Sequence, residues 1–338
     1  MANISDVARS AGVSPTTVSR YLNHRIDLPE PTAARIDAAI AELEYRPNLL
    51  AKRLSTGKSE AIGLVTPEIG NPFFAALAAA VEDEAERHGY AVFMSSTRGD
   101  MAREVASLRR LADRHVDGMI LLTNRPDDGT LARLIGKTGN VVLLDEDIPK
   151  SNAPRIFVEN EEGMYAATQH LIAHGHKAIA MIGGPEGLFS VNERRLGFER
   201  ALRDAGLSLQ PGHMRLGAYT REYGRAAAHL LLEAADAPTA IVSASDFVAI
   251  GVMQAIRDRG LRVPEDLSLV GFDDMPFAEL VAPPLTTVRQ PIAAMGRLGF
   301  QTLLALMNNQ PVKPFIRLPV ELIQRQSVAA PRKGQLKS

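Results

Sequence analysis

The amino-acid sequence predicts two kinds of architecture in one chain: a small all-α head, followed by an α/β core of two doubly wound lobes with parallel sheets. Residues 4–23 contain two short apolar stripes at helical spacing, separated by a glycine, which predicts two helices joined by a tight turn. From residue 61 onward, short apolar runs alternate with helical stretches, as is typical of parallel sheets covered by helices. Because this alternation restarts near residue 156, we expect two lobes of similar construction.

The head is predicted to contain three packed helices. Ile4, Val7 and Ala11 give the first helix an apolar stripe, and Gly12 permits the turn that follows it. Ser14 is suited to cap the second helix, and Pro15 fits its first position, where a missing N–H is no loss. The third helix is expected between residues 29 and 46, and its apolar stripe consists of Ala33, Ile36, Ile40 and Leu43.

The second helix carries hydrogen-bonding side chains on the face opposite its apolar contacts, Val18 and Leu22. A helix with such a face fits the major groove of DNA, with its N-terminal end toward the base edges. A generic helical hairpin with a polar solvent face is the alternative at this point. The polar residues are Thr16, Thr17, Ser19, Arg20 and Asn23.

Composition sets further limits. The 338 residues are enough for two or three domains, and a hydrophobic content of 46% allows a large aliphatic core. The absence of cysteine excludes disulfides and thiolate chemistry. Because the sequence has no long apolar run and no basic leader, we expect a cytoplasmic protein without membrane contact. Residues 1–58 hold eight Lys and Arg against six Asp and Glu, so tight DNA binding is expected to need two heads acting together.

The apolar runs of the core are short and bounded by turn or polar residues, as expected for buried strands. Helices are predicted between them near residues 72–88, 101–115 and 127–137. Open parallel sheets bind ligands beyond the carboxyl ends of their strands, so the residues just after each run are candidates for a binding site. The predicted strands are 62–65, 91–94, 119–122, 141–144, 156–158, 178–182, 240–242 and 267–272.

Carboxylates, amides, a guanidinium and aromatic rings follow these predicted strands. Such a set suits a small ligand rich in hydroxyl groups, held by hydrogen bonds and stacking. The adjacent Asp273 and Asp274 are expected to diverge, one toward the ligand and the other buried or capping. The candidates are Asn71, Phe73, Phe74, Asp145, Glu146, Asn160, Glu161, Glu162, Arg194, Ser245, Asp246, Asp273, Asp274 and Gln290.

Three motifs resemble the helix-turn-helix of the LacI/GalR family of bacterial transcription regulators: Asp6-Val-Ala, Gly12-Val-Ser and Thr17-Val-Ser-Arg20. The resemblance extends from Asn3 to about Pro331. It implies a DNA-binding domain at 1–46, a hinge helix or linker at 47–59 and an effector-binding and dimerisation core at 60–332. The core would be periplasmic-binding-protein-like, and a tail would follow at 333–338. The implied N-lobe covers about 60–158 plus 291–317, and the C-lobe about 159–288 plus 320–332, so the chain would cross three times.

In a second helix that reads DNA, we expect Pro15, Thr16 and Arg20 at base edges, with Arg20 the best donor to guanine. Ser14, Thr17, Ser19 and Asn23 are expected to hold the phosphates. Leu54 matches a residue of the hinge helix that wedges into the minor groove and kinks it. The full expected DNA-binding set is Ser5, Ser14, Pro15, Thr16, Thr17, Ser19, Arg20, Asn23 and Leu54.

Effector-binding roles are implied in the same way. Asn71-Pro-Phe-Phe74 is similar to the loop whose aromatic rings flank the ligand in this family and in periplasmic sugar-binding proteins. Arg194 matches the ligand-binding arginine of the family, and Asp273 matches a carboxylate that accepts from ligand hydroxyls. The full expected set is Asn71, Phe73, Phe74, Asp145, Glu162, Arg194, Tyr219, Ser245, Asp273 and Gln290.

Two positions depart from the family pattern. Ser245 stands where an asparagine is usual, and Glu146 stands where sugar binders often have an arginine. An acid in place of a base argues against an anionic ligand at that end of the site. We therefore expect a neutral or partly cationic, polyol-like effector.

Other classes of protein fit less well. The sequence shows no nucleophile–base pair and no Gly-x-Gly-x-x-Gly motif in a suitable strand context, so an enzyme is not favoured. No cofactor is expected. His170, His174 and His176 are better explained by a helix end and turn, with Gly175 as terminator, than by a metal site. A solute-binding protein or sugar-processing enzyme with the same core and no DNA function is the alternative.

The sequence therefore predicts a sequence-specific DNA-binding transcription regulator, with repression the expected mode. Its expected partners are a pseudo-palindromic operator in double-stranded DNA and a small carbohydrate-like effector. A homodimer is expected because a two-fold operator matches a two-fold protein, and a tetramer is the other assembly compatible with this symmetry.

Overall fold

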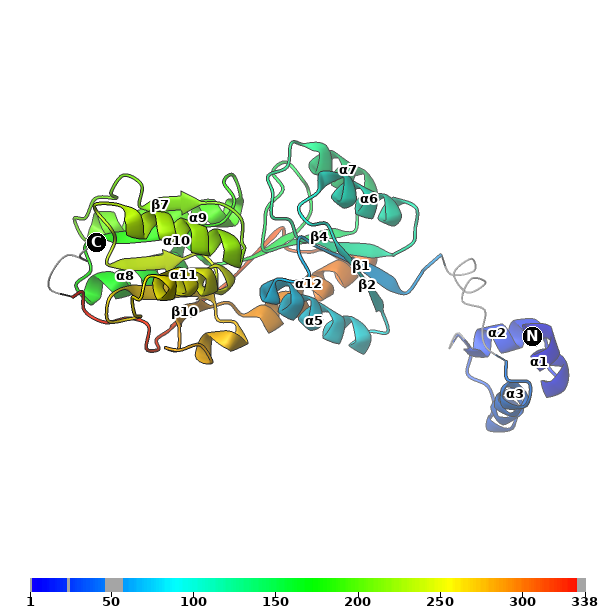
Figure 1. The fold of residues 1–338 in the computed structure, drawn as a ribbon. Helices are drawn as coiled ribbons and strands as arrows, with labels where there is room; N and C mark the ends of the chain where they lie inside the picture. Colours follow the sequence, from blue (N-terminus) through cyan, green and yellow to red (C-terminus); the bar gives the residue numbers. More distant parts are fainter. Residues whose placement is uncertain (1, 23–24, 46–56, 333–338) are drawn as a thin grey trace. The chain divides into compact units, whose positions relative to one another are not determined.

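The computed structural model describes residues 2–22, 25–45 and 57–332 (Figure 1). Contacts divide the chain into two compact units, residues 1–59 and residues 60–338, which are described separately. No helix in the described residues is long and apolar enough to cross a membrane.

The first unit contains the helices predicted for the head: α1 (Ile4–Ala11), α2 (Pro15–Leu22) and α3 (Glu30–Glu42). Val7, Val18 and Ile36, one from each helix, are fully buried and form the centre of its core. Asn3 begins α1 with a capping box, in which its side chain accepts from the Asp6 backbone and the Asp6 carboxylate accepts from the Asn3 backbone. This cap was not part of the prediction from sequence.

The second unit contains two six-stranded sheets. The first has the order β11-β5-β4-β3-β1-β2 and is entirely parallel. Helices α5 and α12 cover one face, and α6 and α7 cover the other. Its elements are β1 (Ala61–Thr66), α5 (Pro72–Arg87), β2 (Ala91–Ser96), α6 (Met101–Ala112), β3 (Gly118–Leu121), α7 (Thr130–Thr138), β4 (Val141–Leu144), β5 (Arg155–Val158), α12 (Ile292–Met307) and β11 (Phe315–Leu318).

The second sheet has the order β12-β10-β9-β8-β6-β7, with α8 and α9 on one face and α10 and α11 on the other. Its edge strand β12 is antiparallel to β10, a departure from the all-parallel pattern. Its elements are α8 (Asn160–Ala173), β6 (Ile179–Gly183), α9 (Phe189–Asp204), β7 (Met214–Leu216), α10 (Arg221–Glu233), β8 (Ala240–Ser243), α11 (Asp246–Asp258), β9 (Ser268–Asp273), the 3₁₀ turn η1 (Pro276–Glu279), β10 (Thr286–Arg289) and β12 (Glu321–Ile323).

The chain passes between the two sheets three times. It leaves the first sheet after β5, returns to it through α12, and leaves it again after β11 (Figure 1). We call the part built on the first sheet the N-lobe and the part built on the second sheet the C-lobe. The predicted fold class, a helical head with a two-lobed α/β core, is confirmed.

Candidate DNA-reading face and effector site

Helix α2 is positioned by its cap and by its buried face. The Ser14 hydroxyl accepts from the backbone N–H of Thr17 at 3.1 Å and lies 2.8 Å from the Thr17 hydroxyl, which confirms the predicted cap. Val18 is fully buried, and the Tyr21 hydroxyl donates to Asp37 of α3 at 2.9 Å. These contacts fix the rotation of α2 about its own axis.

The opposite face of α2 is open to solvent. Pro15, Thr16 and Arg20 are exposed, as are Ser14 at the start of the helix and Ser5 on α1, while Thr17 and Ser19 are half-buried. The expected base-edge residues therefore share one exposed surface. Asn23 and Leu54 lie outside the described residues, as does most of the expected hinge at 47–59.

In the core, a polar cluster forms around Arg194 on α9. Its guanidinium is buried, donates through Nε to Asn160 Oδ1 at 2.8 Å and donates through Nη1 to the Ala244 carbonyl at 2.6 Å. It also lies 4.0 Å from the centre of the Phe272 ring. Burial lowers the pKa of Arg194, but the nearby Tyr219 and acidic groups outweigh this effect and raise it overall.

Asp273, at the end of β9, connects two other expected effector residues. Its carboxylate accepts from the Ser245 hydroxyl at 3.0 Å and from Gln290 Nε2 at 2.8 Å. Burial raises the pKa of this carboxyl to about 7, although Arg194 opposes the shift. Asp274 diverges, as predicted, and pairs with Arg289 and Arg325 instead.

Three buried polar atoms of the expected site have no hydrogen-bond partner among the described residues: Asp145 Oδ1, Tyr219 Oη and Gln290 Oε1. Burial raises the pKa of Asp145, and it raises the pKa of Tyr219 to about 12. Buried polar groups are nearly always bonded in folded proteins, so such atoms are candidates for ligand contacts. Asp145 follows a strand of the N-lobe and Tyr219 belongs to the C-lobe, so the cluster draws on both lobes.

Other expected effector residues have different surroundings. Asn71 caps α5, accepting from the Phe73 backbone at 3.0 Å. Phe73 and Phe74 are buried in the apolar core of the N-lobe, with ring centres 5.4 Å apart. Glu162 lies on an exposed part of α8 and pairs with Arg200 at 2.8 Å, so the structure does not bring it to the cluster.

Glu146 is directed to the other lobe. Its carboxylate bonds to the first turn of α9, at Phe189 and Ser190. The sequence suggested an unpaired acid that would repel an anionic ligand. Glu146 is not such an acid, because its carboxylate already accepts these hydrogen bonds. Asn160 and Asp246 were candidates for ligand contacts, but their observed roles were not predicted: Asn160 accepts from Arg194, and Asp246 accepts from the Met275 backbone and the Thr287 hydroxyl and so supports the Asp273 loop. The Ala244 carbonyl, which also accepts from Arg194, was not a candidate. A backbone carbonyl leaves no signal in sequence.

The raised pKa of Asp273 generates a test. A carboxyl whose pKa is higher in the folded than in the unfolded chain favours folding while it is protonated, and that contribution is lost as the pH rises through about 7. Asp273→Asn cannot ionise, so its melting temperature relative to the parent should rise between about pH 4 and pH 7 and level off above pH 7. Thermal melts of the two full-length chains across this range check the trend. If the melting temperatures of the two chains changed in parallel with pH, the raised pKa of the buried Asp273 carboxyl would be contradicted.

Comparisons with known proteins agree with these observations. Residues 3–48 match the model of "Bacterial regulatory proteins, lacI family", and residues 168–328 match that of a "Periplasmic binding protein-like domain". The HTH-type transcriptional repressor PurR of Aliivibrio salmonicida is 33% identical over 97% of this chain and 99% of its own length. PurR of Haemophilus influenzae is 34% identical, with the same two coverages.

Solved structures are also similar. The lac repressor dimer bound to operator and the anti-inducer ONPF has a TM-score of 0.87 and 31% identity, covering 97% of this chain and 99% of that one. The complex of the transcriptional regulator CelR with cellobiose has a TM-score of 0.74 and 30% identity, covering 97% and 100%. Since these whole-length relatives are transcription regulators, the chain is a DNA-binding regulator and not an enzyme. It belongs to the LacI family of bacterial regulatory proteins.

Proposed function

We propose that this chain is a cytoplasmic homodimeric repressor, and that a small polar effector between its lobes controls how two heads occupy a pseudo-palindromic operator. The observation that carries the effector part is the set of buried, unpartnered polar atoms that both lobes contribute around Arg194. A ligand preferring one arrangement of the lobes would shift the population of that arrangement, and so the DNA affinity.

The exposed face of α2 supports the DNA part. Pro15, Thr16 and Arg20 would read base edges, and Pro15 could offer only an apolar contact, such as to a thymine methyl. Ser14, Thr17, Ser19 and Asn23 would hold phosphates and fix the register. Leu54 would wedge into the minor groove from the hinge.

Arg20→Ala should relax specificity at one base pair in each half-site, at a cost of roughly 1–3 kcal/mol, because a bidentate contact to guanine would be lost. Binding to a panel of single-base operator variants measures this effect. Arg35→Ala, an exposed arginine on α3, is the control and should keep the operator preference. An unchanged preference in Arg20→Ala would refute the assignment.

The chemistry of the Arg194 cluster supports a neutral, donor-rich effector such as a sugar or polyol. Asp145 Oδ1 and Gln290 Oε1 are acceptors, and each would take a hydrogen bond from a ligand hydroxyl. The single guanidinium already donates to Asn160 and Ala244. Whether the effector induces or co-represses depends on which arrangement of the lobes it prefers.

Arg194→Ala should abolish the effector response while operator binding remains, because the guanidinium organises the effector site and not the head. A thermal-shift screen of sugars, polyols and nucleosides identifies a ligand, and its effect on operator binding is then compared between variants. Arg195→Ala, a half-buried neighbour on the same helix, is the matched control. A normal response from Arg194→Ala would show that the site lies elsewhere.

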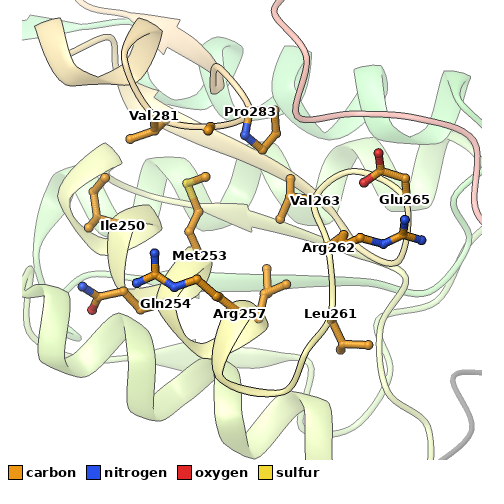
Figure 2. A pocket seen from close by; sticks show the side chains of 12 residues that line it. Ile250, Met253, Gln254, Arg257, Leu261, Arg262, Val263, Glu265, Val281 and Pro283 are labelled. Carbon is orange, nitrogen blue, oxygen red and sulfur yellow. The ribbon is translucent and has the colours of Figure 1, made fainter.

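A second surface of the C-lobe is proposed to join two copies. A cavity of about 600 Å³ lies between α11 and the segments 261–265 and 281–283 (Figure 2). Ile250, Met253 and Val281 give it apolar walls, and the neighbouring Leu280 is 78% exposed. A second copy is the proposed occupant, because a two-fold operator requires a two-fold protein and the similar lac repressor structure is a dimer.

Leu280→Asp should shift the protein toward monomer, since a charge would be placed on an apolar contact without disturbing the core. Sedimentation measures the mass, which also distinguishes dimer from tetramer, and operator affinity should fall as the dimer is lost. Leu196→Asp changes another exposed leucine, on α9, and should remain dimeric. An unchanged mass for Leu280→Asp would exclude this face.

A further inference from the structure

Helix α9 begins without a cap of its own. The preceding residue is Leu188, whose side chain cannot hydrogen-bond to the first turn. The first turn itself contains no acidic residue. The first N–H groups of a helix have no intrahelical partner and form the positive end of its dipole. The residue just before the helix supplies a side-chain cap for α5, α6, α10 and α11, whereas α7, α8 and α12, like α9, have no such cap.

The missing cap is supplied from the other lobe. Glu146, which follows strand β4 of the N-lobe, accepts from the backbone N–H of Phe189 at 2.6 Å and from the Ser190 hydroxyl at 2.7 Å. The Ser190 N–H lies 3.4 Å from the same carboxylate. Glu146 and Ser190 are each 3% exposed, so the bonds are shielded from water.

Two more contacts from the N-lobe reach the same end of α9. Arg317 of β11 donates twice to the Glu193 carboxylate, at 2.9 and 2.7 Å. The Phe157 ring of β5 lies 4.9 Å from the Phe189 ring, centre to centre. The strands β4, β5 and β11 are neighbours in the first sheet, so one edge of the N-lobe holds the start of α9.

We propose that Glu146 is a positioning residue that caps α9 across the lobe boundary and holds the two lobes together before any effector binds. This role rests on the proposed effector site, because Arg194 lies on the same helix, directly after Glu193. Separating the lobes would expose the α9 N-terminus and leave Glu146 without these donors. An effector that prefers this closed arrangement would strengthen an existing closure, and Glu146 would influence its affinity without contacting it.

The test measures the separation of the lobes in the full-length protein. Because the chain contains no cysteine, Arg133→Cys on α7 and Arg203→Cys on α9 allow two specific labels, one on each lobe. A large excess of unlabelled chain keeps one labelled protomer in each dimer. Energy transfer between the labels then reports the distance between the lobes without effector or DNA.

Glu146→Ala should shift the distance to longer values, and Glu146→Gln, which keeps an acceptor oxygen, should restore part of the closure. Arg317→Gln, which keeps the length of the side chain, should give a smaller shift in the same direction. Hydrogen exchange at Phe189 and Ser190 should become about fivefold or more faster in Glu146→Ala, because the acceptor of their backbone N–H groups is lost. Glu199→Ala removes an ion pair within α9 and is the control that should match the parent.

Parent-like distances in both Glu146→Ala and Arg317→Gln would overturn the proposal, even if local exchange increased, because the cap would then be a local feature of α9. The distance readout requires neither ligand nor operator. A chain that failed to bind DNA would refute the proposed function and leave this result standing. A chain that repressed normally, with unchanged distances, would refute only the cross-lobe cap.

Discussion

Burial of the Arg194 guanidinium is the constraint that organises the boundary between the lobes. A buried charge is costly unless it is paired and hydrogen-bonded. Here it is met by Asn160 at the start of α8, by the Ala244 carbonyl after β8 and by the nearby carboxylates of Asp145 and Asp273. The ends of several elements must therefore stay together for this charge to be tolerated, and this requirement preorganises a polar site.

The same helix that carries Arg194 also connects the lobes. The first turn of α9 is hydrogen-bonded to Glu146, and Glu193 on the same helix is paired with Arg317 of β11. Arg194 is the residue after Glu193. A ligand that moves the guanidinium thus acts on the helix whose start is held by the N-lobe. Less than two turns of α9 therefore separate the expected ligand-binding guanidinium from the residues held by the N-lobe, so a bound solute could be coupled to the arrangement of the lobes over this short distance.

The sequence predicted the strands of the core well because buried parallel strands are continuous apolar runs. It did not predict β7, β11 or β12, which are short, partly exposed and lack such a run. It also did not predict β10, which is buried but begins with two threonines. Residues just after strands were placed near the carboxyl ends of the sheets, and the divergence of Asp273 and Asp274 was anticipated. The surroundings of Glu146 and Glu162 were not, because a local pattern does not specify which distant helix a side chain meets.

Glu146 was the reason to expect a neutral or cationic effector, and the structure replaces that reason with another. The Glu146 carboxylate accepts hydrogen bonds at the N-terminus of α9, and the Asp274 carboxylate forms ion pairs with two arginines. Asp145 and Asp273 remain, facing the single guanidinium of Arg194. An anionic ligand would place negative charge beside two carboxyl groups whose pKa burial already raises, with one guanidinium to offset it. A ligand with several hydroxyl or N–H donors would instead satisfy the acceptors that the protein leaves unpaired.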